Sequence, residues 1–456
     1  MPRRRRHPHP ERMTGFGRMR QFSAYVTKVF QLGQRLETTV TDTRRGGLYE
    51  SYVAFLLVLT MLWQRYRSFN AFEGTLGDPP MRKLLAGYDI PPWAQTIKDI
   101  CKTIELSSLE QLHQTILRTA AKNKVFDATK LHGQRYFAFD GVEPFSSYNL
   151  SCHGCHTRTH DTAHGEVIEY YHRYVFVQSV GPTPHLILGF EPQASAAQRR
   201  AKQKKPSQEQ VKAEGELTAV KPLVDRLRSI FPRLFAAGVG DALYANGPAF
   251  AFMRAGPAPL DMIAILKKET DEPMADALNV FAHMKPEHYY DCTRGEHVLM
   301  WDSEGFEGLS TCPYPLRVIK ALVHKGRRKL DWTAIDWEDP EQANTWWMTT
   351  GISQQRMSGS QVFDVMRHRW DEENCAFNDL TQNWNFKHSY LHHENGTQVM
   401  MYAFMIAFNL FQLFLYRCLR DFSPTAMTGV GVADEMKRDA ATITDPRDGF
   451  YCPDSS

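Results

Sequence analysis

The chain has 456 residues, of which 43% are hydrophobic and 23% are charged, a composition typical of a folded protein of two or three domains. Its eight cysteines are too few for a disulfide scaffold, which excludes the small disulfide-rich classes. The formal net charge of +3 is unevenly spread, because residues 1–45 carry eleven Lys and Arg against three Asp and Glu. This distribution favours a polyanionic partner, and a solvated, disordered tail is the alternative.

The N-terminal part of the chain is predicted to be helical. A flexible basic arm (1–12) precedes a helical domain (13–130), in which apolar residues recur with helical spacing. The helical segments are Phe22–Leu36, Tyr49–Tyr66, Trp93–Ile104 and Leu109–Ala121.

Short strands begin abruptly after Arg135. Residues 131–267 are predicted to form the first part of a core, with strands at Tyr136–Phe139, Val167–Gln178, Pro184–Phe190, Leu234–Gly240 and Met262–Lys267, and helices at 209–230 and 249–255. Residues 268–350 are predicted to be a β-rich insertion, with strands at Val298–Asp302, Leu316–His324 and Trp346–Gly351.

The C-terminal helices of the core (351–420) are predicted at Ser358–Leu380 and 399–416, and a poorly ordered tail (421–456) follows. The run Val399–Tyr416 is almost long enough to span a membrane, but it contains Asn409 and Gln412, so we expect a buried helix and no membrane association. The N-terminus lacks a signal peptide, so we expect a cytoplasmic, nucleoid-associated protein.

This element order predicts an α/β (α+β) mixed sheet with an RNase H-like core. Asp140 ends the first strand, Asp241 ends the fourth, and Glu373 lies in the predicted helix 358–380. Such a fold brings these three carboxylates together, and phosphodiester chemistry needs a carboxylate cluster that holds divalent cations. Each carboxylate alone is a weak signal, because an aspartate at a strand end is common in turns.

The motifs around these residues resemble one branch of the bacterial insertion-sequence transposases, which have an Asp-Asp-Glu triad. They are Phe139-Asp140-Gly141 with Tyr170-Tyr171-His172, Gly240-Asp241-Ala242-Leu243-Tyr244, and Arg369-Trp370-Asp371-Glu372-Glu373-Asn374. The resemblance covers residues 130–420. The chain departs from the branch at Ala242, where a second Asp is usual, at Met366, where a Tyr is common, and at Thr381, where a Lys is usual.

The resemblance implies a DNA transposase that cleaves strands at transposon ends and transfers the 3′ hydroxyl to target DNA. Asp140, Asp241 and Glu373 would hold two Mg²⁺ or Mn²⁺ ions, and Arg369 and Lys387 would contact phosphate. Double-stranded DNA is the implied partner, residues 13–130 the implied end-binding domain, and a homodimer the implied synaptic form. A catalytically inactive DNA-binding descendant and a structure-specific nuclease remain alternatives.

A cysteine–histidine cluster follows the first Asp motif. The spacing of Cys152, Cys155, His160 and His172 is that of a Cys2His2 structural zinc site. His153, His156 and His164 compete for the ligand positions, and a loop without metal is the alternative. Residues 152–156 also match the C-x-x-C-H pattern of haem attachment, which the missing export signal disfavours.

Three basic runs are candidate DNA contacts, because end binding requires neutralisation of several phosphates. They are Arg3–Arg6, Arg199–Lys205 and Lys325–Lys329. For Trp346 and Trp347 we expect core packing.

Overall fold

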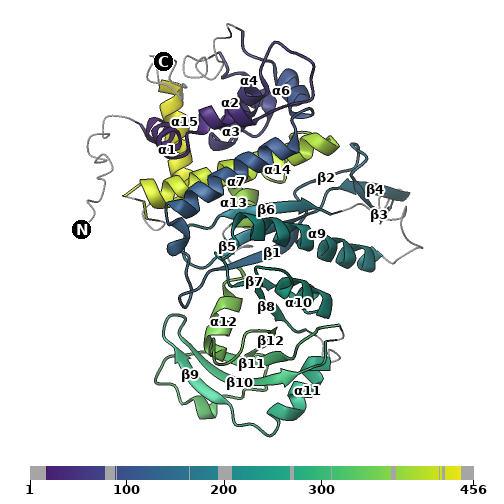
Figure 1. Cartoon of the computed structure of the whole chain (residues 1–456), viewed down its shortest axis with the longest axis vertical. Coiled ribbons are helices and arrows are strands. Elements are labelled where there is room, and N and C mark those ends of the chain that lie inside the picture. Colours follow the sequence, from purple (N-terminus) through teal and green to yellow (C-terminus); the bar gives the residue numbers. More distant parts are fainter. Residues whose placement is uncertain are drawn as a thin grey trace.

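The computed structural model describes residues 17–442, apart from 78–87, 89, 164, 194–207, 268–271, 310, 371–375, 421 and 424–426. Helices from both ends of the chain lie together at one end of the molecule, and the strands of the insertion lie at the other (Figure 1). A mixed sheet connects the two ends.

Within the described residues, the sheet has nine strands in the order β6-β5-β1-β7-β8-β12-β11-β10-β9. The first five are β1 (Tyr136–Val142), β5 (Tyr174–Val180), β6 (Ile187–Pro192), β7 (Ala237–Gly240) and β8 (Asp261–Ile265). β5 is antiparallel to β1 and β6, whereas β7 is parallel to β1 and β8. This order and these directions are those of an RNase H-like sheet, so the predicted fold class is confirmed.

The insertion extends the same sheet. Its strands are β9 (Glu287–Asp291), β10 (Glu296–Phe306), β11 (Leu316–Lys325) and β12 (Asn344–Thr350), and β12 pairs with β8. The three strands predicted here are present, and β9 was not predicted. Trp347 is buried and stacks on Phe281 of α11 (Glu272–Phe281), and Trp346 packs against Phe363, so the expected core packing is confirmed.

The single strand predicted at 167–178 is wrong. The chain forms β4 (Gly165–Tyr171), which belongs to a separate small sheet with β2 (Ser146–Ser147) and β3 (His156–Thr162), and then β5. β4 is largely exposed, whereas β5 is buried throughout. The break falls at His172 and Arg173, two buried polar residues that turn toward the sites described below.

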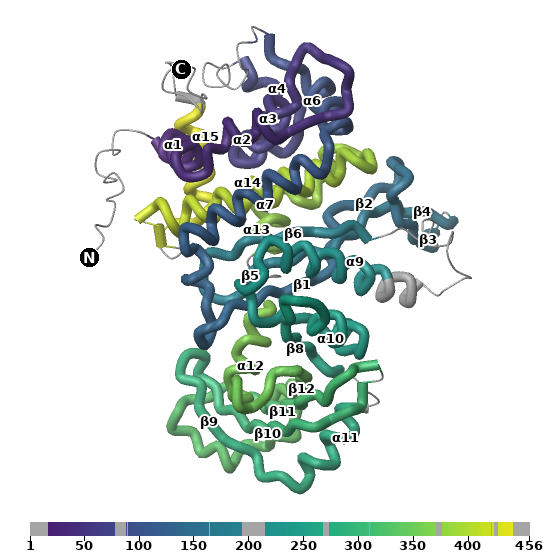
Figure 2. Tube along the Cα trace, viewed as in Figure 1, coloured from purple at the N-terminus to yellow at the C-terminus, as the bar shows by residue number. Residues whose placement is uncertain are grey.

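Helix α14 (Glu394–Leu413) is the centre of the helical layer. It packs against α3 (Ser51–Trp63), α7 (Leu106–Lys122) and β6, and Figure 2 shows it beside α7 above the sheet. Together with the turn that follows, it is long and apolar enough to span a membrane, but 94% of its apolar window is buried inside the protein. The predicted buried helix is therefore confirmed.

The remaining helices surround these elements. On the N-terminal side they are α1 (Arg18–Phe30), α2 (Leu32–Thr39), α4 (Phe69–Glu73) and α6 (Ala94–Cys101). On the core side they are α9 (Gln208–Ile230), α10 (Gly247–Arg254), α12 (Gly359–Arg367) and α13 (Asn378–Asn383). The helix predicted at 358–380 is thus represented by α12, which begins at a Ser358 capping box, and by α13.

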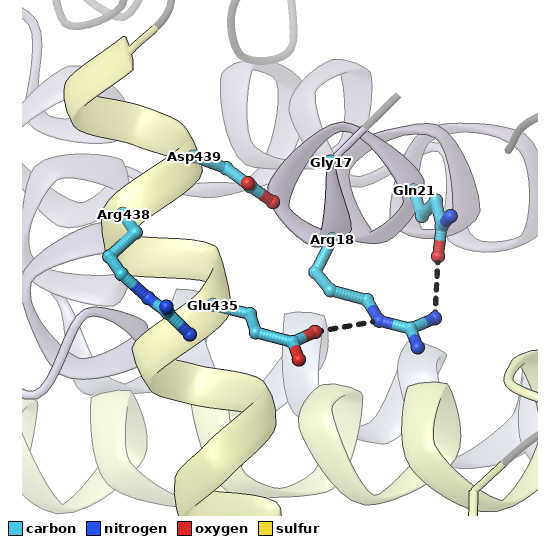
Figure 3. A pocket seen from close by; sticks show the side chains of 6 residues that line it. All are labelled: Gly17, Arg18, Gln21, Glu435, Arg438 and Asp439. Carbon is cyan, nitrogen blue, oxygen red and sulfur yellow. Dashed lines mark hydrogen bonds and ion pairs between the residues drawn. The ribbon is translucent and has the colours of Figure 1, made fainter. Parts of the chain in front are cut away.

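The prediction of a poorly ordered tail is wrong for residues 429–442, which form helix α15 (Gly429–Thr442). α15 packs on α1, where the Arg18 Nε atom lies 3.0 Å from the Glu435 Oε2 atom (Figure 3). Val432, Ala433 and Met436 are fully buried. These residues form an apolar helix face that was not predicted, because most of the residues around them in the sequence are polar.

Candidate active site and metal centre

Two aspartates lie at the same level of neighbouring parallel strands. β1 and β7 pair with Tyr136 opposite Ala237 and Ala138 opposite Val239. Two residues beyond this last pair are Asp140 on β1 and Asp241 directly after β7. The charge of Asp241 contributes to the pKa of Asp140, which reflects their proximity.

Short hydrogen bonds orient both side chains. The Asp140 Oδ1 atom accepts a hydrogen bond from its neighbour Gly141 N at 2.7 Å. The Asp241 Oδ1 atom accepts one from Leu243 N at 2.8 Å, and so caps the short helix η4 (Ala242–Tyr244). Each carboxylate keeps its second oxygen outside these bonds.

A third carboxylate, Glu216 of α9, joins the two aspartates. It is only 5% exposed, and the Tyr244 hydroxyl donates a 2.8 Å hydrogen bond to its Oε1 atom. Its Oε2 atom lies beside Gly141, at 2.6 Å from the position that a Cβ atom there would occupy. No sequence motif pointed to this residue, because a glutamate in a polar helix is ordinary.

Burial and mutual repulsion raise the pKa of Asp140 and of Glu216. Burial, with the charges of Glu216 and Asp241 added, raises the pKa of Asp140 to about 6, although the Gly141 hydrogen bond and Arg369 oppose the shift. Burial also raises the pKa of Glu216, against the hydrogen bond from Tyr244. The protein therefore holds acidic groups together at an electrostatic cost.

Arg369, a predicted phosphate contact, lies in the site. It is 5% exposed, and its Nη1 atom lies 3.8 Å from the Asp140 Oδ2 atom. Lys387, the other predicted contact, lies exposed in the turn after α13. Glu373 lies outside the described residues, between Trp370 and Ala376, so its predicted place beside the aspartates stays a prediction.

The donor chemistry of these carboxylates suits a hard divalent cation, although the ligand oxygens of the three are not all within 4.8 Å of one another. Carboxylate oxygens are the ligands that Mg²⁺ and Mn²⁺ prefer, and Asp140, Asp241 and Glu216 supply them in a partly dehydrated setting. The guanidinium groups of Arg369 and Arg173 lie 3.8 and 3.6 Å from Asp140 and Glu216, beyond hydrogen-bonding distance. A cation bound among the carboxylates would offset their repulsion.

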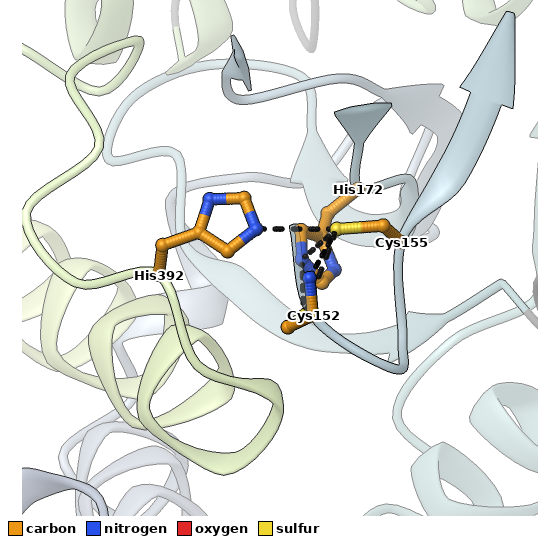
Figure 4. Close-up of side chains that lie close together, drawn as sticks. All are labelled: Cys152, Cys155, His172 and His392. Carbon is orange, nitrogen blue, oxygen red and sulfur yellow. Dashed lines mark hydrogen bonds between the residues drawn. The ribbon is translucent and has the colours of Figure 1, made fainter. Parts of the chain in front are cut away.

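A second cluster contains Cys152, Cys155, His172 and His392, whose ligand atoms all lie within 4.8 Å of one another (Figure 4). The two Sγ atoms are 3.7 Å apart, and the His172 Nε2 atom lies 3.3 and 3.5 Å from them. The His392 Nε2 atom lies 3.2 Å from the Cys155 Sγ atom. Tetrahedral zinc with ordinary bond lengths separates its sulfur and nitrogen ligands by about 3.3–3.8 Å, so the cluster has the size of such a site.

The predicted ligand His160 lies outside this cluster. It points from β3 toward β4, where its Nε2 atom lies 2.6 Å from the Glu169 Oε2 atom. His392 replaces it, from the segment just before α14. His392 was not predicted because it lies 237 positions beyond Cys155, far outside the local spacing of a zinc motif.

The haem alternative finds no support in this geometry. The histidine of the C-x-x-C-H pattern, His156, is buried, and its Nε2 atom lies 3.1 Å from the Gln193 carbonyl oxygen. The two thiols face His172 and His392 instead. The cluster therefore has the arrangement of a small metal centre.

Of the basic runs, Lys325–Lys329 lies at the end of β11, where Arg327, Arg328 and Lys329 are exposed. Arg3–Arg6 and Arg199–Lys205 lie outside the described residues.

Comparisons with known proteins give a likeness at the level of structure. No family model and no curated protein matches the chain. Among solved structures, the chain is similar to one from a cryo-electron microscopy structure of a piggyBac transposase synaptic complex with hairpin DNA, at 10% identity and a TM-score of 0.39, covering 93% of this chain and 78% of that one. At that similarity, the fold assignment rests on the strand order described above.

Proposed function

We propose that the protein is a DNA transposase of the Asp-Asp-Glu type, which cleaves strands at the ends of its element and joins the freed 3′ hydroxyl to target DNA. The observation that carries the proposal is that Asp140 on β1 and Asp241 directly after β7 lie at the same level of two adjacent parallel strands. Both residues stand in motifs that resemble those of insertion-sequence transposases. Glu373 completes the triad by its Arg369-Trp370-x-x-Glu373-Asn374 motif.

In this proposal the carboxylates of Asp140, Asp241 and Glu373 hold two Mg²⁺ or Mn²⁺ ions. Ions bound there supply electrostatic activation of the attacking oxygen and stabilisation of the leaving oxygen. Arg369 would contact a phosphate near Asp140 and steady its orientation. The buried setting of the site strengthens these charge interactions because little water screens them.

Double-stranded DNA, as transposon ends and target, is the proposed partner. The N-terminal helices would bind the ends, and the exposed basic residues after β11 would neutralise phosphates. Synapsis of two ends implies a homodimer, and the proposed location is the cytoplasm, at the nucleoid.

For the second cluster we propose a structural zinc ion held by Cys152, Cys155, His172 and His392. Thiolate and imidazole ligands suit zinc, and a closed set of four protein ligands is typical of structural sites. Such an ion would tie the loop after β2 to the segment that leads into α14.

A strand-cleavage assay tests the enzymatic proposal. With DNA that carries the ends of the encoding element, the protein should nick at the element's tip with Mg²⁺, should not nick with EDTA, and should join the 3′ end to a target duplex. Nicking without joining would identify a structure-specific nuclease. Specific binding without nicking would identify an inactive DNA-binding descendant.

A further inference from the structure

We propose that Glu216 is a further metal-binding carboxylate of this active site, beyond the Asp-Asp-Glu triad. The inference rests on the proposed function, because it concerns the ions that Asp140 and Asp241 would hold. It assigns to α9, the helix between β6 and β7, a direct part in the chemistry.

The first aspartate motif leaves room for Glu216. A Cβ atom at position 141 would lie 2.6 Å from the Glu216 Oε2 atom and 2.9 Å from its Cδ atom, closer than such atoms approach in proteins. Glycine directly after Asp140 therefore permits the Glu216 carboxylate to lie against the backbone of β1. Any other residue would push it away from Asp140.

The second aspartate motif holds Glu216 in place. Tyr244, three residues after Asp241, is fully buried, and its hydroxyl donates to the Glu216 Oε1 atom at 2.8 Å. The Tyr244 ring itself packs edge-on against Phe139, with ring centroids 4.3 Å apart. Both motifs thus position one carboxylate, whose Oε2 atom is not bound by Tyr244 and lies 3.6 Å from the Arg173 Nη2 atom.

The carboxylates around Glu216 concentrate negative charge in a buried place, which favours a bound cation. Asp140, Asp241 and Glu216 bring three acids together, and the charge of Asp241 also acts on Glu216. Arg173 lies 3.6 Å from Glu216, but its Nε atom also lies 3.5 Å from Glu143. Because buried acids without sufficient countercharge are costly, a divalent ion bound among them would supply charge that the contact with Arg173 and the hydrogen bonds from Tyr244 and Gln193 supply only in part.

An anchoring role and a metal-binding role predict different results for Glu216→Gln. A glutamine oxygen can still accept the hydrogen bond from Tyr244, so a purely structural role of this side chain would be retained in the variant. A metal ligand would not, because the charge is lost. Glu143→Gln is the matched control, since it removes another carboxylate near Arg173.

The experiment is a Mn²⁺ titration of the zinc-loaded full chain, followed by electron paramagnetic resonance. We expect Glu216→Gln to weaken Mn²⁺ binding at least about 10-fold, as Asp140→Asn also does, and Glu143→Gln to leave it unchanged. Normal binding by Glu216→Gln, with binding lost in Asp140→Asn, would overturn this inference alone. Normal binding by all variants would overturn the proposed active site as well.

A measurement on the wild type covers the case in which Glu216→Gln does not fold. Fe²⁺ in place of Mg²⁺, with ascorbate and peroxide, cleaves the backbone next to the bound ion. Cleavage near residue 216 as well as near 140 and 241 is expected. Cleavage at 140 and 241 without cleavage at 216 would overturn the inference.

Discussion

The Nε2 atom of His392 lies 3.2 Å from the Sγ atom of Cys155, although 237 positions separate the two residues. The contact joins the loop between β2 and β3 to the start of α14, the helix at the centre of the helical layer. A metal ion at this point would connect the edge of the RNase H-like core to that layer.

We predict that His392→Ala releases zinc from the purified protein and lowers its melting temperature, because a site with three ligands binds the ion less tightly. His160→Ala is the control: this histidine is exposed and pairs with Glu169, so zinc should be retained and stability should change by less than about 1 kcal/mol. Metal analysis and thermal unfolding measure both effects. Zinc loss from His160→Ala and not from His392→Ala would restore the ligand set predicted from the sequence.

Asn409→Leu is expected to destabilise the protein by about 1–3 kcal/mol or more. The buried Asn409 side chain accepts from the Ile187 backbone N–H at 2.8 Å and donates to its carbonyl oxygen at 2.7 Å, so it completes the edge strand β6. Leucine would leave both groups without these partners. The control Gln398→Ala, on the same helix, should lower the free energy of unfolding much less. Equal decreases for the two variants in denaturant unfolding would contradict this account.

Stability should decrease as the pH falls from about 6.5 toward 4, partly because of His113. This residue is buried beside Ile187, and burial lowers its pKa from 6.5 to about 4. The unfolded chain therefore binds a proton in this range that the folded chain does not, which favours unfolding. His113→Gln should reduce this loss in the free energy of unfolding by about 1.4 kcal/mol per pH unit, which amounts to a few kcal/mol over the range. Denaturant midpoints of the wild type and of His113→Gln at pH 7.5 and 5 measure this difference. An equal loss of stability in the two proteins would contradict the role of His113.

Met436→Ala is predicted to cost about 2–5 kcal/mol, because Met436 is fully buried where α15 packs on the helical layer. The exposed neighbour Arg438 provides the comparison, and Arg438→Ala should cost less than about 0.5 kcal/mol. If thermal unfolding showed Met436→Ala to be as stable as the wild type, α15 would not be part of the folded domain.

The sequence predicted those features that depend on local patterns. The strand that ends near Asp140 and the strand before Asp241 are recognisable by their apolar runs, and their order along the chain gives the sheet topology. The central helix near 399–416 was recognisable by composition.

Features that depend on contacts between distant segments could not be predicted in this way. Glu216 reaches the aspartates only because α9 packs on the sheet, and His392 reaches the cysteines only because α14 lies beside the small sheet's loop. Likewise, no local pattern shows that β12 pairs with β8, so the insertion's continuity with the core sheet was missed. The break at His172 was missed because both flanking strands are rich in β-forming residues.

The most direct test of the central claim is metal-dependent nicking at the tip of the encoding element, compared between the wild type, Asp241→Asn and Glu373→Gln. The account predicts nicking by the wild type with Mg²⁺, none with EDTA, and a loss of at least about 100-fold in both variants. Undiminished nicking by Asp241→Asn, or no nicking by a folded wild type that binds the element's ends, would contradict it.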